Sequence, residues 1–126
     1  MAQLNAEQLA QFERDGFLLL EGFVKPEECA ALRERAAGLV ESFDPRGVVS
    51  IFSTKEQTRT SDDYFLSSGD CIRFFFEERA FDKDGHLRQS KERSINKIGH
   101  ALHDLDAVFN RFSRSPKIAS LVADLG

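Results

Sequence analysis

The sequence predicts an α+β domain in which helices pack on a mainly antiparallel sheet. Apolar residues recur at helical spacing after Pro26, which indicates an amphipathic helix over residues 26–42. Residues 71–76 alternate between two faces in the way typical of a strand, and the later pair Asp84-Gly85 is of the kind that closes a β-hairpin. At 126 residues the chain has the length of one domain or of part of one.

The first helix is predicted over residues 6–14. Asn5 and Gln8 stand three positions apart, as the partners of a capping box do, and Gly16 follows as a helix stop. The run GFLLLEGFV over residues 16–24 is apolar and lies between a glycine and a lysine-proline pair. This length and these boundaries favour a buried strand over a helix.

The second helix, over residues 26–42, begins with a proline and two glutamates, which suit a helix N-terminus. Its predicted buried stripe consists of Cys29, Leu32, Ala36, Leu39, Val40 and Phe43. A turn is predicted at residues 44–47, because Asp, Pro and Gly dominate turns. A short strand over 48–52 and a polar loop over 53–63 are expected to follow.

In the strand over 71–76, Ile72, Phe74 and Phe76 are expected on one face, and Arg73 and Phe75 on the other. The hairpin turn at residues 84–85 should bring Phe81 beside Leu87. Two further helices are predicted over residues 107–112 and 116–125, with Gly126 as a C-cap.

Composition excludes several classes of function. The net charge of −4 does not favour nucleic-acid binding. The longest apolar run, FLLL, is too short to span a bilayer, so no membrane partner is expected. Two cysteines are too few for a disulfide framework and suggest a reducing compartment. No signal-peptide pattern and no C-terminal Ser-Lys-Leu are present, so we expect a cytoplasmic protein.

Two metal sites can be considered from the pattern alone. His100, His103 and Asp104 are close in sequence, but hydrolases with two zinc-binding histidines on a helix use His-Glu-x-x-His, and here the spacing is His-Ala-Leu-His. We favour histidines that are hydrogen-bonded near the edge of the core. A calcium loop starting at Asp82 would need Gly and Glu where Leu87 and Arg93 stand, so the hairpin is the better interpretation.

Lys97 lies in an apolar stretch and is a candidate for an anion site together with Arg73. A buried ammonium group must find a partner, and that partner is a bound organic anion, a local carboxylate or solvent. Cys71 and Cys29 are expected to be buried structural thiols and not nucleophiles, because the first is in an aromatic strand and the second on an apolar helical stripe.

Three stretches together resemble the phytanoyl-CoA dioxygenase family. They are FERDGFLLLEGFVKPEEC, DYFLSSGDCIRFFFEERAFDKDG and KERSINKIGHALHDLDAVF, in this order. The resemblance implies an Fe(II)- and 2-oxoglutarate-dependent oxygenase built on a double-stranded β-helix, or jelly roll. It also implies that Lys97, the lysine of INKIGHAL, contacts the co-substrate 2-oxoglutarate. Ala107 departs from the family pattern, in which proline is expected.

The same resemblance implies an iron site formed by a His-x-Asp pair and a later histidine, with an arginine further on for the co-substrate. None of His86, His100 and His103 has an aspartate two positions later. We therefore expect residues 1–126 to be the N-terminal portion of the family's domain, with no metal ligands, no catalytic residues and helices around an incomplete sheet.

Three interpretations of function remain open from the sequence. In the first, the chain is a piece of an oxygenase and is inactive alone. In the second, it is a non-catalytic binding or interaction module with a residual anion site at Lys97, which associates through unpaired strand edges. In the third, least favoured, it is a metal hydrolase that uses His100, His103 and Asp104.

Overall fold

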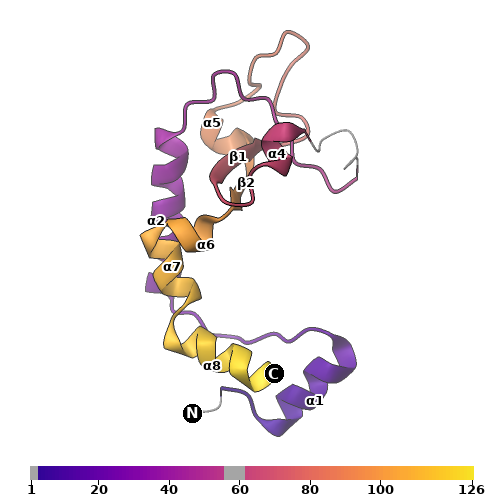
Figure 1. Cartoon of the computed structure of the whole chain (residues 1–126), viewed down its shortest axis with the longest axis vertical. Helices are drawn as coiled ribbons and strands as arrows, with labels where there is room; N and C mark the ends of the chain where they lie inside the picture. The colour runs from indigo at the N-terminus through magenta and orange to yellow at the C-terminus, as the bar shows by residue number, and fades with distance from the viewer. Residues whose placement is uncertain (1–2, 56–61) are drawn as a thin grey trace.

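The computed structural model describes residues 3–55 and 62–126. A small sheet lies at one end of the molecule, and α1 (Ala6–Asp15) and α8 (Pro116–Leu125) lie at the other (Figure 1). Between them, α2 (Pro26–Ser42) runs beside α7 (Ala107–Ser113). Helices with a small antiparallel sheet confirm the predicted α+β class.

The capping box predicted for the first helix is present. The Asn5 side chain accepts a hydrogen bond from the Gln8 backbone N–H at 2.9 Å, and the Gln8 side chain accepts one from the Asn5 N–H at 3.0 Å. Gly16, at φ 75°, ends α1 in the left-handed conformation that glycine adopts without a steric penalty. The Asp124 carboxylate on α8 accepts a hydrogen bond from the Leu4 N–H at 2.8 Å and thereby joins the two ends of the chain.

The prediction of a strand over residues 16–24 is wrong. Phe17 and Leu19 are 67% and 74% exposed, and this segment forms neither helix nor strand. A strand requires a neighbour to pair its N–H and C=O groups, and no segment of residues 3–55 and 62–126 takes that place. The segment is therefore only partly buried, with Leu18, Leu20, Phe23 and Val24 half-buried and Lys117 of α8 lying against the Phe23 ring.

The helix predicted over residues 26–42 is confirmed as α2, but its packing differs from the expectation. Cys29 is exposed, so its assignment as a buried thiol is wrong, whereas Cys71 is half-buried. The elements beside α2 meet it on the side of Ala31 and Leu32, where α7 lies, and leave Cys29 in solvent. Val40, near the sheet, is the residue of α2 that becomes fully buried.

The sheet consists, in the described residues, of β1 (Ile72–Phe76) and β2 (Ile95–His100). The strands are antiparallel, and Phe75 lies opposite Lys97. A register shift follows between Phe75 and Phe76, so that Phe76 pairs with Ile95. The strand predicted over 71–76 is therefore confirmed, one residue shorter at its start.

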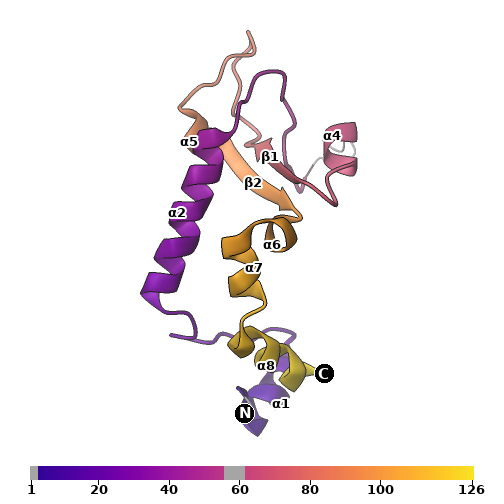
Figure 2. The same ribbon diagram turned by 60° about the vertical axis from the view of Figure 1, so that its left-hand side comes forward.

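The two faces of β1 are covered by different elements, as the alternation predicted. Phe74 stacks on Phe43 at the end of α2, with ring centroids 4.3 Å apart. On the other face, Phe75 packs against Tyr64 and Phe65 of the short helix α4 (Asp63–Leu66), at 5.5 Å from each ring. Figure 2 shows α2 and α4 on opposite sides of the strands.

Residues 48–55 pair with the sheet only at one point. Ile51 forms an isolated parallel bridge with Phe76, so the predicted strand over 48–52 is reduced to this contact. Most of the loop predicted over 53–63 lies outside the described residues, but Asp63 begins α4 instead of ending a loop. The Asp62 side chain caps that helix by accepting a hydrogen bond from the Phe65 N–H at 2.8 Å.

The remaining predictions agree with the structure. Phe81 and Leu87 form an antiparallel bridge around the turn at Gly85, whose φ is 83°. The two C-terminal helices are α7 and α8, with Gly126 as the C-cap of α8. Three short helices of the described residues were not predicted: α4, α5 (Lys91–Ser94) and α6 (Leu102–Leu105).

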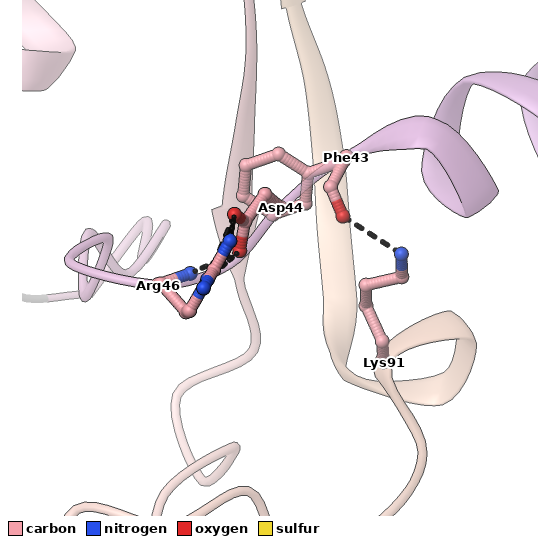
Figure 3. A network of polar contacts seen from close by, with 4 residues as sticks. All are labelled: Phe43, Asp44, Arg46 and Lys91. Carbon is pink, nitrogen blue, oxygen red and sulfur yellow. Dashed lines mark hydrogen bonds and ion pairs between the residues drawn. The ribbon is translucent and has the colours of Figure 1, made fainter.

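Lys91 of α5, the helix that directly precedes β2, holds the C-terminal end of α2 through hydrogen bonds. Its Nζ donates hydrogen bonds to the backbone carbonyl oxygens of Glu41 at 2.8 Å and Phe43 at 2.7 Å, as Figure 3 shows for Phe43. Such carbonyls at a helix C-terminus lack partners within the helix. In the adjoining turn, hydrogen bonds from Arg46 lower the pKa of the Asp44 carboxyl to about 2. These contacts hold Phe43 over Phe74.

Candidate functional site

Lys97 lies on the face of the sheet that α4 covers. It is opposite Phe75, and directly opposed residues of antiparallel strands share one face. Its Nζ is 4.3 Å from the ring centroid of Phe52 and 6.0 Å from that of Phe65. The half-buried lysine thus lies near two aromatic rings, and a third aromatic residue, Phe75, is its cross-strand neighbour.

The Lys97 ammonium forms neither a hydrogen bond nor an ion pair with any residue that the structure describes. A ring face compensates an exposed cation by about 0.5–1 kcal/mol, less than a desolvated carboxylate would. Among the described residues, therefore, no local carboxylate pairs with this lysine. The ammonium can accept an anion from solution.

Arg73, the predicted companion of Lys97, has a different environment. Its guanidinium donates a hydrogen bond to the Ser67 hydroxyl at 2.8 Å, donates another to the Tyr64 backbone oxygen, and lies 4.7 Å from the centroid of the Tyr64 ring. These contacts attach α4 to β1. Arg73 therefore stabilises the wall on which Lys97 lies, and both hydrogen bonds come from its Nη1.

His100, the last residue of β2, lies on the same wall. Its Nδ1 is 2.6 Å from the Ser68 hydroxyl, and its ring is 5.1 Å from Phe65 and 5.6 Å from Phe75. Burial lowers the pKa of His100 below its ordinary value, and the charge of Lys97 lowers it further. The prediction of a hydrogen-bonded histidine at the edge of the core is confirmed for this residue.

The other candidate metal ligands are not brought together. His103 is on α6, exposed, with its Nε2 3.5 Å from Asp104, while His86 is in the exposed turn beside Asp82. Across residues 3–55 and 62–126, no three His, Cys, Asp or Glu side chains form a group that could hold a metal ion. The interpretation as a metal hydrolase through His100, His103 and Asp104 therefore has no geometric support.

Phe52 connects the lysine to a polar groove of about 480 Å³. The groove is lined by Phe52, Ser53, Thr54, Glu77, Glu78, Arg79, Gln89, Arg93 and Asn96. Sequence reasoning missed both Phe52 and the groove, because their residues come from four separate segments. Tyr64 and Phe65 lie in one of the stretches that resemble the family, but nothing local in the sequence places Phe52 beside Lys97.

Comparison with known proteins identifies the family of this chain. The family model described as phytanoyl-CoA dioxygenase matches residues 12–125. The chain is 50% identical, over 131 aligned positions, to phytanoyl-CoA dioxygenase domain-containing protein 1 of Mus musculus, covering 100% of the chain and 45% of that protein. It is 48% identical to phytanoyl-CoA dioxygenase 1 of Oryza sativa subsp. japonica, covering 97% of the chain and 43% of that protein.

A third relative, a homolog of domain-containing protein 1 from Dictyostelium discoideum, is 46% identical over 98% of the chain and 44% of its own length. The chain thus spans a little under half the length of the relatives it matches. No helix in the described parts of the chain is long and apolar enough to cross a membrane. The match over nearly all residues shows that the chain belongs to the phytanoyl-CoA dioxygenase family.

Proposed function

We propose that residues 1–126 form one wall of the co-substrate pocket of an Fe(II)- and 2-oxoglutarate-dependent dioxygenase, with Lys97 binding a carboxylate of 2-oxoglutarate. The observation that carries this proposal is an ammonium group 4.3 Å from the Phe52 ring centroid, without an acidic partner in the described residues. A carboxylate ligand supplies the charge-assisted hydrogen bonds that the rings cannot. Membership of a dioxygenase family supports the choice of this ligand.

The antiparallel pair β1 and β2 belongs, in this proposal, to a double-stranded β-helix, whose other strands lie outside residues 1–126. The exposed apolar side chains Phe17 and Leu19 support this view, as do the edges of the two-stranded sheet, which in the described residues are paired only at the bridge from Ile51 to Phe76. A two-stranded sheet is seldom stable alone, and apolar strand-like segments usually gain partners. We also place the protein in the cytoplasm, which its two free thiols support.

The residues present do not fit an iron ion. Iron in such oxygenases requires two histidines and a carboxylate on one face of the metal, and the described residues contain no such group. We therefore propose that the chain alone binds the co-substrate only weakly, and that it does not catalyse its oxidation. No step through iron is assigned to these residues.

A second candidate function is a non-catalytic interaction module with the same anion site. The large apolar side chains that remain exposed favour it, because apolar surface and open strand edges promote association. Size-exclusion chromatography with light scattering tests this reading. Self-association that Phe17→Ser and Leu19→Ser reduce would support it, whereas a monomer at all concentrations would count against it.

The anion site is tested by calorimetric titration of 2-oxoglutarate into the purified chain and its Lys97→Gln variant. Lys83, which is exposed and 3.9 Å from Asp84, provides the matched control Lys83→Gln. We expect binding that Lys97→Gln abolishes and Lys83→Gln leaves unchanged. Equal binding by all three proteins would refute the assignment of Lys97, and oxygen-dependent formation of succinate with added iron would refute the proposed lack of activity.

A further inference from the structure

His100 and Lys97 share a wall, and both lie against Phe65. The ring of His100 is 5.1 Å from the Phe65 centroid, and the Lys97 Nζ is 6.0 Å from it. Burial lowers the pKa of the imidazole, and the positive charge of Lys97 lowers it further. The protonation state of His100 should therefore affect how tightly Lys97 binds a ligand.

The Ser68 hydroxyl determines which nitrogen of His100 carries the proton. Ser68 is fully buried, and its Oγ lies 2.5 Å from the backbone oxygen of Phe65 and 2.6 Å from the Nδ1 of His100. A hydroxyl has one proton to donate, and a carbonyl oxygen can only accept. Both contacts are satisfied when Ser68 donates to Phe65 and Nδ1–H of His100 donates to Ser68.

In this tautomer the Nε2 atom of His100 keeps its lone pair. Nε2 forms no hydrogen bond with a described residue, and it is not among their buried atoms without a partner. Protonation of the ring must then occur at Nε2, because Nδ1 already carries a proton. The added proton creates a second positive donor on the wall that carries Lys97.

We propose that His100 is a second anion-binding residue of the Lys97 site, held by Ser68 as the Nδ1–H tautomer and converted by protonation at Nε2 into a donor for the bound anion. This inference rests on the proposed function of Lys97. It makes anion binding at that site dependent on pH. By linkage, an anion that binds more tightly to the protonated form also favours that protonation. Anion binding should therefore strengthen as the pH falls below neutrality.

The elements next to His100 carry other ionisable groups. They are Arg73 on β1, Tyr64 on α4, Asp70 and Cys71 before β1, and His103 and Asp104 on α6. Arg73 is bound to α4, and Lys97 is the charged group that acts on the His100 pKa. His103 is exposed beside Asp104 and offers a histidine outside the wall as a control.

Two measurements on the full chain test the proposal. Long-range proton–nitrogen correlation spectra at pH 7.5 report the tautomer of each histidine without any ligand. We expect a protonated Nδ1 and an unprotonated Nε2 for His100, and a loss of this preference in Ser68→Ala. A protonated Nε2 in the neutral ring of the wild-type protein would overturn the assignment.

The second measurement is calorimetric titration of 2-oxoglutarate at pH 7.5 and pH 5.5. We expect affinity at the lower pH to be greater by about fivefold or more, with the increase lost in His100→Gln and retained in His103→Gln. Lys97-dependent binding with the same pH profile in His100→Gln would overturn this inference alone. If no Lys97-dependent binding occurs at either pH, both the proposed function and the role of His100 in it are refuted. The spectra would still establish the tautomer of His100.

Discussion

The contacts of Asp106 predict how much its substitution should lower the free energy of unfolding. Its side chain is 3% exposed, accepts a hydrogen bond from Arg35 on α2 at 2.6 Å, and caps α7 by accepting hydrogen bonds from the N–H groups of Val108 at 3.0 Å and Phe109 at 3.2 Å. One carboxylate thus begins one helix and attaches it to another. Removing it should loosen the contact between α2 and α7.

The two roles of Asp106 can be separated by substitution. Asp106→Ala removes the cap, which costs about 1 kcal/mol, and also the ion pair. Arg35 is 43% exposed, so solvent screening reduces the pair to about 1 kcal/mol. Asp106→Ala should therefore lower the free energy of unfolding by about 2 kcal/mol, and Asp106→Asn by about 1 kcal/mol, because asparagine also caps helices well.

Urea unfolding followed by circular dichroism measures both values, with Asp104→Asn as the control. Asp104 is half-exposed and pairs with Arg114 at the surface, so its substitution should change the free energy by less than about 0.5 kcal/mol. The reasoning fails if Asp106→Ala is as stable as the wild-type protein, or if Asp106→Asn is as damaging as Asp106→Ala.

The pH dependence of the same contact has a defined sign. Burial raises the pKa of Asp106, but the hydrogen bonds from Arg35, Phe109 and Val108 outweigh it and leave the pKa below the ordinary value. A carboxyl whose pKa is lower in the folded state contributes stability above its unfolded pKa of about 3.9. This contribution is lost as the pH falls from about 4 through the folded pKa, and Asp106→Asn should flatten that part of the stability profile. If the free energy of unfolding of Asp106→Asn depended on pH as steeply as that of the wild-type protein in this range, this reasoning would be contradicted.

Three further predictions concern other parts of the molecule. Phe75→Ala should lower the free energy of unfolding by about 3–5 kcal/mol, because this fully buried ring packs on Tyr64 and Phe65; a loss under 1 kcal/mol in urea unfolding would contradict the packing. Asn5→Ala should reduce it by about 1 kcal/mol through the lost cap, and Asn5→Asp should not. Lys91→Met should speed amide exchange at the end of α2, and unaltered exchange there would show that its two hydrogen bonds do not hold the helix end.

The longer helices, α1, α2, α7 and α8, could be predicted because their signals are local. Asn5 and Gln8 bond to each other across one turn, and the prolines that begin α2 and α8 lie within the helices they start. The hairpin turn at Gly85 was predicted for the same reason. In each case the residues that decide the conformation are within a few positions of it.

Strands and the site were predicted less well because they depend on distant partners. The apolar run at Phe17 has the pattern of a strand, but pattern alone does not supply a neighbouring strand. Lys97 was identified through family resemblance and its apolar surroundings, whereas its contact with Phe52 depends on a single bridge between Ile51 and Phe76. Nothing near Lys97 in the sequence contains that information.

The most direct test of the central claim is a titration of 2-oxoglutarate followed by nuclear magnetic resonance. We predict that the ring signals of Phe52 and Phe65 and the side-chain signals of Lys97 shift together and saturate, and that Lys97→Gln removes the ring shifts. No saturable change at these three residues, or shifts confined to the groove around Arg79 and Arg93, would contradict the account.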